Sequence, residues 1–258
     1  MAEHQQKERL ALLIDADNAQ ASLCSDLLAE VAKFGVVTVR RAYGDWTREN
    51  LRGWKEHLHR HAIQPIQQFA YTKGKNATDS SLIIDAMDLL HKERLDGFCI
   101  VSSDSDFTRL ATRIREDGLV VYGFGEQKTP EAFVAACDRF VYTELLRAGS
   151  TGQFDAQTSH PASVAVPSQV GGIGHDGATS ETQELIGQAV DAVSSEDGWA
   201  HLAEVGSYLT KNDPSFDSRR YGFAKLSQLV KSLPGFQIEE RRVGTVASAT
   251  SVYVRRWA

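Results

Sequence analysis

The chain has 258 residues, of which 42% are hydrophobic, enough for one sizeable core and a second, smaller one. Its net charge of -6 excludes a global basic field, so any contact with nucleic acid must come from a local patch. The three cysteines lie far apart without a Cys-x-x-Cys pair, which argues against a disulfide framework. The polar start and the lack of an apolar run of roughly 20 residues predict a cytoplasmic protein without a signal peptide or membrane span.

Strands and helices are expected to alternate between about residue 10 and residue 145. Each apolar run of strand type is followed by a segment in which apolar residues recur at helical spacing. Parallel strands need such crossover connections, so the pattern predicts a mainly parallel sheet with helices on both faces. Pro65 lies in the third run and favours an edge position for that strand. The expected strands are residues 10–14, 36–43, 63–69, 98–101 and 119–124.

Aspartates stand at the ends of two of these strands. Asp15 closes the first strand, and Asp104 and Asp106 follow the fourth after two serines. The carboxyl ends of the strands in a doubly wound sheet border one crevice, so these side chains are expected to converge there. Asp79 lies in the apolar stripe of the helix that precedes the fourth strand. It stands at the positively polarised start of that helix, which directs its carboxylate to the same crevice.

Several carboxylates in one hollow predict a bound cation. Like charges so close raise one another's pKa unless a divalent ion neutralises them. Ligation by oxygen alone favours Mg²⁺ or Mn²⁺ over zinc, and no group of His and Cys has the spacing of a zinc motif.

Structural roles are open for the same acids. Asp15 or Asp17 can cap the helix that follows, and Asp104 can cap its own helix, which is compatible with metal binding. Thr78 is expected as the N-cap of the helix that carries Asp79.

Other polar residues of these helices are interpreted as solvent-facing. Asp85 and Asp88 lie beside or away from the apolar stripe, although a supporting role behind the ligands stays open for Asp85. The histidines at positions 57, 59 and 61 alternate, which spreads them around a helix axis as surface residues.

Three motifs of this region resemble those of NYN domains, LabA-like bacterial members included, in the PIN-like nuclease superfamily. They are Leu-Leu-Ile-Asp-Ala-Asp-Asn at 12–18, Lys-Asn-Ala-Thr-Asp at 75–79 with Asp85 further on, and Ser-Ser-Asp-Ser-Asp-Phe at 102–107. Ser103 departs from the pattern, where a glycine is common. The resemblance implies a PIN-like three-layer α/β/α domain over residues 8–146 with metal-dependent ribonuclease activity. It implies that Asn18 lies in the site and that the metal ligands are Asp15, Asp79, Asp104 and Asp106.

The rest of the chain is expected to hold a linker and a second domain. Gly, Ser, Thr, Ala and Gln dominate residues 149–180, where no Lys or Arg occurs, so residues 147–180 are expected to form a flexible linker. Three helices and an antiparallel hairpin over residues 181–258 predict a small winged-helix domain. Residues 198–200, 221–229 and 233–236 resemble the OST-HTH (LOTUS) domain, which implies binding of RNA or of a protein partner.

Local basic residues provide candidate RNA contacts. Arg219, Arg220 and Lys225 cluster at the start of a helix of the second domain, where they can form a phosphate patch. Lys73 and Lys75 lie on the loop before Asp79 and can hold phosphates next to the scissile one.

The expected function is therefore metal-dependent hydrolysis of single-stranded RNA. Two alternatives stay open. A phosphatase of haloacid-dehalogenase type would use Asp15 and Asp17 as nucleophile and general acid, but Ala19 stands where such enzymes have a threonine. A non-catalytic RNA-binding adaptor would leave the metal site inactive or absent.

Overall fold

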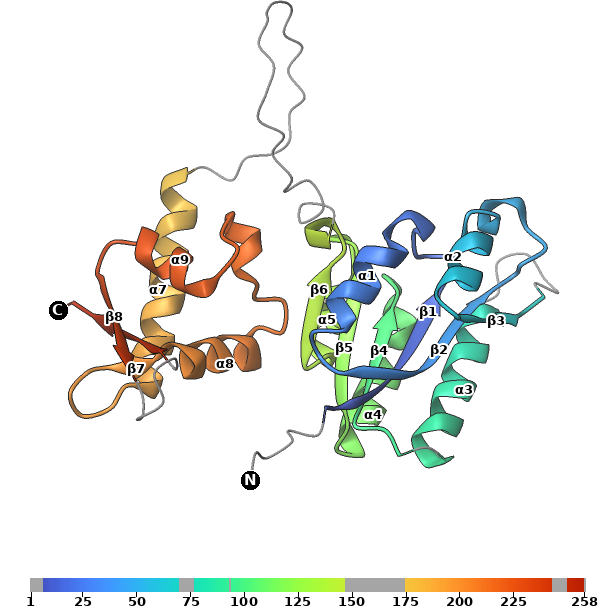
Figure 1. The fold of residues 1–258 in the computed structure, drawn as a ribbon, viewed down its shortest axis with the longest axis horizontal. Coiled ribbons are helices and arrows are strands. Elements are labelled where there is room, and N and C mark those ends of the chain that lie inside the picture. The colour runs from blue at the N-terminus through green and yellow to red at the C-terminus, as the bar shows by residue number, and fades with distance from the viewer. Residues whose placement is uncertain (1–6, 70–76, 93, 147–174, 243–249, 258) are drawn as a thin grey trace, which may run out of the picture. The chain divides into compact units, whose positions relative to one another are not determined.

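The computed structural model describes residues 7–69, 77–92, 94–146, 175–242 and 250–257. The chain divides into two compact units, residues 1–152 and 153–258, each with its own core (Figure 1). Among the described residues, no helix combines the length and the apolar character needed to cross a membrane.

Six parallel strands form the sheet of the first unit. Their order across the sheet is β3-β2-β1-β4-β5-β6, which confirms the expected parallel α/β architecture. β3 is an edge strand, as Pro65 predicts. β6 has four residues, too few to show a period in the sequence. The strands are β1 (Arg9–Asp15), β2 (Val36–Gly44), β3 (Gln64–Gln67), β4 (Gly97–Val101), β5 (Val120–Gly125) and β6 (Arg139–Tyr142).

Helices cover both faces of this sheet and make three layers (Figure 1). Alternate residues of β1 face opposite sides: Leu12 packs with α1 and α2, and Leu13 packs with α3, α4 and α5. The α-helices are α1 (Cys24–Val31), α2 (Trp54–Arg60), α3 (Ala77–Lys92), α4 (Thr108–Glu116) and α5 (Glu131–Ala136). Short 3₁₀ turns are η1 (Ala21–Leu23), η2 (Glu49–Leu51) and η3 (Ser105–Phe107).

The strand order reverses between β1 and β4, which positions the site. Chain connections leave β1 toward one edge of the sheet and β4 toward the other, so a crevice forms beyond their carboxyl ends. Ile14 is in register with Val101. The residues that follow them, Asp15 and Ser102, are therefore brought side by side from positions far apart in the sequence.

The second unit contains three helices and a three-stranded antiparallel sheet of order β7-β9-β8. α7 begins within the stretch that we expected to be linker, and the hairpin turn at 243–249 lies outside the described residues. η4 ends at Tyr221 and is followed by Gly222, which has a positive φ. α9 begins at Leu226, because the backbone of its N-cap residue Lys225 is extended. The elements are α7 (His175–Val193), β7 (Ala200–His201), α8 (Leu202–Asn212), η4 (Ser218–Tyr221), α9 (Leu226–Ser232), β8 (Phe236–Arg242) and β9 (Thr250–Arg256).

Close packing around Gly123 of β5 makes a first prediction. A Cβ atom there would overlap the Phe140 ring and lie 2.6 Å from Cys137 Sγ, both fully buried. Gly123→Ala is expected to lower the free energy of unfolding by about 1–3 kcal/mol in urea titrations, because a packed core cannot absorb an added methyl. Gly53→Ala is the control, since its Cβ would meet only Ala21 at 3.6 Å. Equal stability of the two variants would contradict this account of the core.

Candidate metal centre

Asp15, the last residue of β1, is fully buried and held from two sides. Its Oδ2 atom accepts hydrogen bonds from Asn18 Nδ2 at 2.7 Å and from Ser102 Oγ at 2.8 Å. Its Oδ1 atom is buried and has no hydrogen-bond partner among the described residues. Burial raises the pKa of Asp15, the bonds from Asn18 and Ser102 lower it, and the charge of Asp17 raises it. The unpaired oxygen is costly to bury unless a further group, such as a cation, meets it.

Three other carboxylates converge on one point. One oxygen each of Asp79, Asp104 and Asp106 lies within 4.8 Å of the other two. Asp79 is buried in the first turn of α3, Asp104 is half-buried after β4, and Asp106 is exposed. These carboxylates come from two segments of the chain, so their proximity is produced by the fold.

Asp104 caps the start of a 3₁₀ turn and also belongs to this group of carboxylates. Asp104 is the N-cap of η3, and its Oδ1 atom accepts a hydrogen bond from the Asp106 backbone N–H at 2.9 Å. Its own backbone N–H donates to Ser102 Oγ at 3.1 Å. Ser102 thus joins Asp104 to Asp15, a connection that the sequence motifs do not reveal. The N-cap of η1 is Gln20, so neither Asp15 nor Asp17 caps that turn.

The electrostatics of Asp79 show that Asp15 belongs to the same group of acids. Burial and then the charges of Asp15, Asp104, Asp106 and Asp17, in that order of size, together raise the pKa of Asp79 to about 6. The crevice therefore gathers negative charge from several carboxylates. A divalent cation with oxygen ligands fits this donor set.

Asp17 also lies beside this group of acids, although the sequence suggested it only as a cap or as the general acid of a phosphatase. Its Oδ2 atom accepts a hydrogen bond from Thr78 Oγ1 at 3.0 Å, which ties the loop after β1 to the start of α3. Thr78 therefore lies inside the first turn, since α3 begins at Ala77, and the prediction that it is the N-cap is wrong. The equal spacing of Asp15 with Asp17 and of Asp104 with Asp106 is the signal that could have identified Asp17.

Asp85 lies away from the carboxylate group and is not simply solvated. Arg41 Nη1 and Tyr43 Oη of β2 each donate to one of its oxygens at 2.5 Å. Burial and then the bond to Asp85 raise the pKa of Tyr43, so its hydroxyl stays protonated and donates. This interaction neutralises Asp85 and fixes the middle of α3 to the sheet. The solvent-facing interpretation of Asp85 is therefore wrong.

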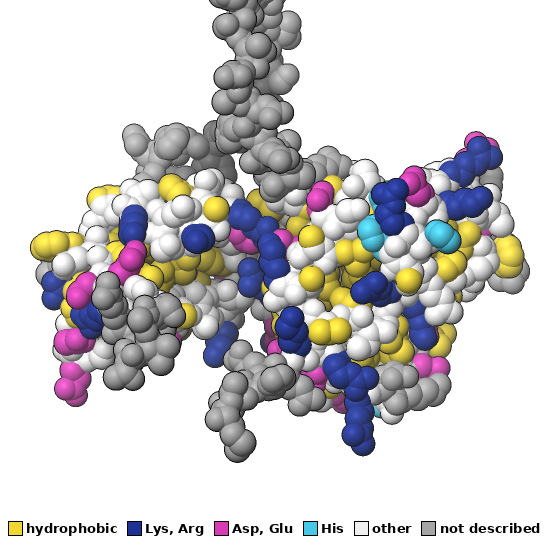
Figure 2. Space-filling model, in the orientation of Figure 1, with side chains coloured by type: hydrophobic (Ala, Val, Ile, Leu, Met, Phe, Trp, Pro, Cys, Tyr) yellow, Lys and Arg dark blue, Asp and Glu magenta, His cyan; other side chains and the backbone are white. Residues whose placement is uncertain are grey.

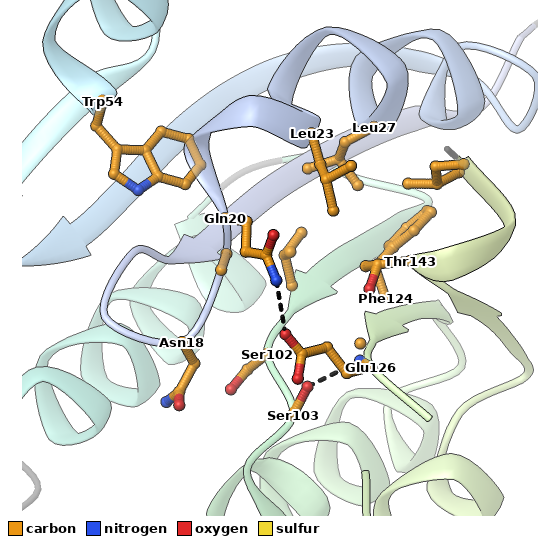
Figure 3. Close-up of a pocket in the computed structure, with 14 residues that line it drawn as sticks. Asn18, Gln20, Leu23, Leu27, Trp54, Ser102, Ser103, Phe124, Glu126 and Thr143 are labelled. Carbon is orange, nitrogen blue, oxygen red and sulfur yellow. Dashed lines mark hydrogen bonds between the residues drawn. The ribbon is translucent and has the colours of Figure 1, made fainter. Parts of the chain in front are cut away.

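A small pocket of about 20 Å³ lies beside α1 and is lined in part by Asn18 and Ser102, the two residues that donate to Asp15 (Figure 3). Asn18, Ser102 and Ser103 form part of its polar wall, and apolar side chains such as Leu23 and Phe124 line its interior. Gln20 Nε2 donates to Glu126 Oε1 at 3.1 Å, and the Glu126 backbone N–H donates to Ser103 Oγ at 2.9 Å. Ser103 stands where related domains commonly have a glycine, and its hydroxyl has a structural role here because it accepts a hydrogen bond from the loop after β5.

Of the five residues predicted to contact RNA, two lie outside the described residues and two are bonded within the protein. Lys73 and Lys75 lie outside the described residues. Arg219 forms an ion pair with the buried Asp217, which it contacts at 2.7 Å, and Arg220 Nη1 donates to Ser215 Oγ at 3.0 Å. Lys225 is exposed.

A different group of the second unit combines arginine with aromatic rings. The Arg241 guanidinium lies 4.7 Å from the ring centre of Trp199 and 4.6 Å from that of Tyr253. The guanidinium of Arg255 lies 4.9 Å from Trp199. Residues 199, 241, 253 and 255 are called the Arg–Trp cluster below. Contacts between these arginines and the aromatic rings depend on the fold, because Trp199 is far from the other three residues in the sequence.

Comparison with known proteins identifies both parts of the chain. A family model of the NYN domain matches residues 9–146, and one of the OST-HTH/LOTUS domain matches residues 180–246. No curated protein matches the chain.

Three of the matching solved structures are bacterial proteins. A Vibrio parahaemolyticus protein of unknown function is 18% identical, with coverage of 54% of this chain and 95% of that one and a TM-score of 0.47. An uncharacterized Nitrosomonas europaea protein is 32% identical, with coverage of 41% and 93% and a TM-score of 0.28. Residues 175–257 of a Chromobacterium violaceum protein are 43% identical, with coverage of 29% and 78% and a TM-score of 0.25. On the family match over more than half of its length, the chain belongs to the NYN domain family, with an OST-HTH/LOTUS domain following the NYN domain.

Proposed function

We propose that this chain is a ribonuclease that depends on Mg²⁺ or Mn²⁺, with the metal held by Asp15, Asp79, Asp104 and Asp106. NYN domains belong to the PIN-like nuclease superfamily, and OST-HTH/LOTUS domains bind RNA, so a nuclease acting on RNA is plausible from the families alone. The observation that carries the metal dependence is the convergence of carboxylates from β1, α3 and the β4 loop. Burial and the charges of these neighbours together raise the pKa of Asp79 to about 6.

The donor set fits a hard dication. All candidate ligands are carboxylates, and the unpaired Oδ1 atom of Asp15 would gain a partner. A bound Mg²⁺ or Mn²⁺ would supply Lewis-acid stabilisation of charge on the phosphodiester and lower the pKa of the attacking water. Asn18 and Ser102 fix the orientation of the Asp15 carboxylate through their hydrogen bonds. A carboxylate of the group, such as the exposed Asp106, would orient the attacking water.

The second domain would bring RNA to this centre. Trp199 is buried under the guanidinium groups of Arg241 and Arg255, so it holds these two cations in place. The guanidinium groups would bind phosphates by charge and stack on unpaired bases. We propose the domain limits 8–146 and 181–258, with a linker at 147–180. Because the linker tethers the two domains, RNA bound to the second domain would have a raised local concentration at the first. Arg219, Arg220 and Lys225 remain candidate phosphate contacts, and a protein partner of this domain remains possible. The comparisons give no support to the phosphatase alternative.

Substitution of single acids tests the activity. Asp15→Asn and Asp104→Asn are expected to reduce cleavage of single-stranded RNA in Mn²⁺ or Mg²⁺ at least about 100-fold, because a ligand charge is lost while the side-chain shape is kept. Asp88→Asn, on the exposed side of α3, is the matched control and should cleave as the wild type does. RNA binding should persist in all variants. Absence of cleavage by the wild type would instead support the adaptor alternative.

The pH dependence of stability tests whether burial and neighbouring carboxylates raise the pKa of Asp79. The native pKa of Asp79, about 6, is above its unfolded value of 3.8, so the native state binds more protons between these pH values and loses stability as pH rises through them. In the metal-free protein, Asp79→Asn is expected to raise the free energy of unfolding by about 1–2 kcal/mol at pH 7.5, and the gain should vanish near pH 4. Mg²⁺ should stabilise the wild type more than the variant in thermal melts. A gain that is constant with pH would contradict the electrostatic account.

Salt-dependent RNA binding tests the Arg–Trp cluster. In an Asp104→Asn background, Arg241→Ala is expected to weaken binding of single-stranded RNA about 3- to 10-fold, since one cation and one stacking edge are lost. Lys231→Ala removes an exposed cation of α9 that pairs with Glu240, and serves as the control. Fluorescence anisotropy at several salt concentrations measures both variants. Equal losses would assign the affinity to net charge rather than to the cluster.

A further inference from the structure

A second group of potential ligands lies on the other helical layer of the NYN domain. One ligand atom each of Cys24, His57 and His61 lies within 4.8 Å of the other two. Cys24 begins α1, His57 is in α2, and His61 follows α2 directly. His57 and His61 are four residues apart and share one helix face, with their rings nearly parallel at 6.1 Å. The prediction that all three histidines of this helix spread over the surface is therefore wrong for this pair.

The surroundings of the group indicate a ligand. The Nδ1 atom of His57 is buried and has no hydrogen-bond partner in the described part of the chain. Leaving such an atom unpaired is unfavourable. An unprotonated imidazole nitrogen can coordinate a metal ion instead. Cys24 is fully buried, while His57 and His61 are half-buried. Figure 2 shows histidine side chains reaching the surface on the face that carries α1 and α2, so an ion could enter from solvent there.

We propose that Cys24, His57 and His61 bind one zinc ion. One thiolate with two imidazoles is a ligand set that suits zinc and not Mg²⁺ or Mn²⁺. Ligand atoms of a tetrahedral zinc site lie about 3.5 Å apart, so the 4.8 Å spread requires only small side-chain rotations. The fourth position would hold water on the open side, near Ser25, whose Oγ lies 3.4 Å from His61 Nε2.

Zinc binding at this place has a definite chemical cost and structural effect. Burial raises the pKa of the Cys24 thiol to about 11, so the metal-free side chain is protonated at neutral pH. When zinc binds, the S–H proton is released to solvent and the sulfur–zinc bond forms, with no change in oxidation state. The ion would join the start of α1 to the end of α2, two short helices that otherwise meet through apolar packing. The site is independent of the proposed nuclease activity.

Cobalt substitution tests the proposal on the full chain. The experiment uses the Asp104→Asn variant in excess Mg²⁺, so that Co²⁺ binding at the carboxylates does not contribute to the signal. Co²⁺ is expected to produce a thiolate-to-cobalt charge-transfer band that saturates at one ion per chain and disappears when Zn²⁺ is added. Cys24→Ser should abolish the band, and His61→Ala should weaken binding at least about tenfold.

Matched variants keep the test decisive. Cys137→Ser replaces another buried thiol, and His59→Ala replaces the exposed histidine of the same helix, so both should keep the band. Zn²⁺ should raise the Tm of the background protein by about 5 °C and leave that of the His61→Ala variant unchanged, which covers the case in which Cys24→Ser does not fold. Absence of the band in the background protein, or its survival in Cys24→Ser, would overturn the proposal. Loss of RNA cleavage in the wild type would not affect it.

Discussion

Repulsion among carboxylates at the crossover between β1 and β4 is the constraint on which the NYN domain depends. Asp15, Asp79, Asp104 and Asp106 approach one another because the strand order reverses at that point, and burial makes the charges of Asp15 and Asp79 expensive. Asn18 and Ser102 stabilise one charged oxygen of Asp15 but leave the other unpaired. The fold thus concentrates negative charge at one place, and a divalent cation is the simplest group that neutralises it.

The rest of the domain holds these charges in position. Arg41 and Tyr43 fix α3 through Asp85, so the start of that helix cannot swing away to relieve the repulsion on Asp79. Thr78 and Asp17 join the same helix to the loop after β1. The apolar residues of β1 pack against both helical layers and are fully buried. Rigid support of this kind is what a site of like charges requires when it is empty of metal.

Much of this arrangement could be predicted from the sequence because it follows local rules. Alternating apolar runs and helical stripes gave the parallel sheet, and aspartates after two strands indicated the crevice. The partners of Asp85, the link from Ser102 to Asp104, and the meeting of Cys24 with His57 and His61 depend on three-dimensional packing between distant segments. No spacing in one sequence encodes such contacts, and β6 was too short to show a period.

The double role of Asp104 has an evolutionary consequence. The oxygen that caps η3 belongs to the same side chain that faces the metal centre. Asparagine at this position would keep the cap acceptor and lose the charge, whereas alanine would lose both. If the proposed nuclease activity holds, a lineage could lose it in one conservative step without an intermediate that fails to fold. Inactive descendants of this domain should then carry an amide or a hydroxyl here more often than an apolar residue.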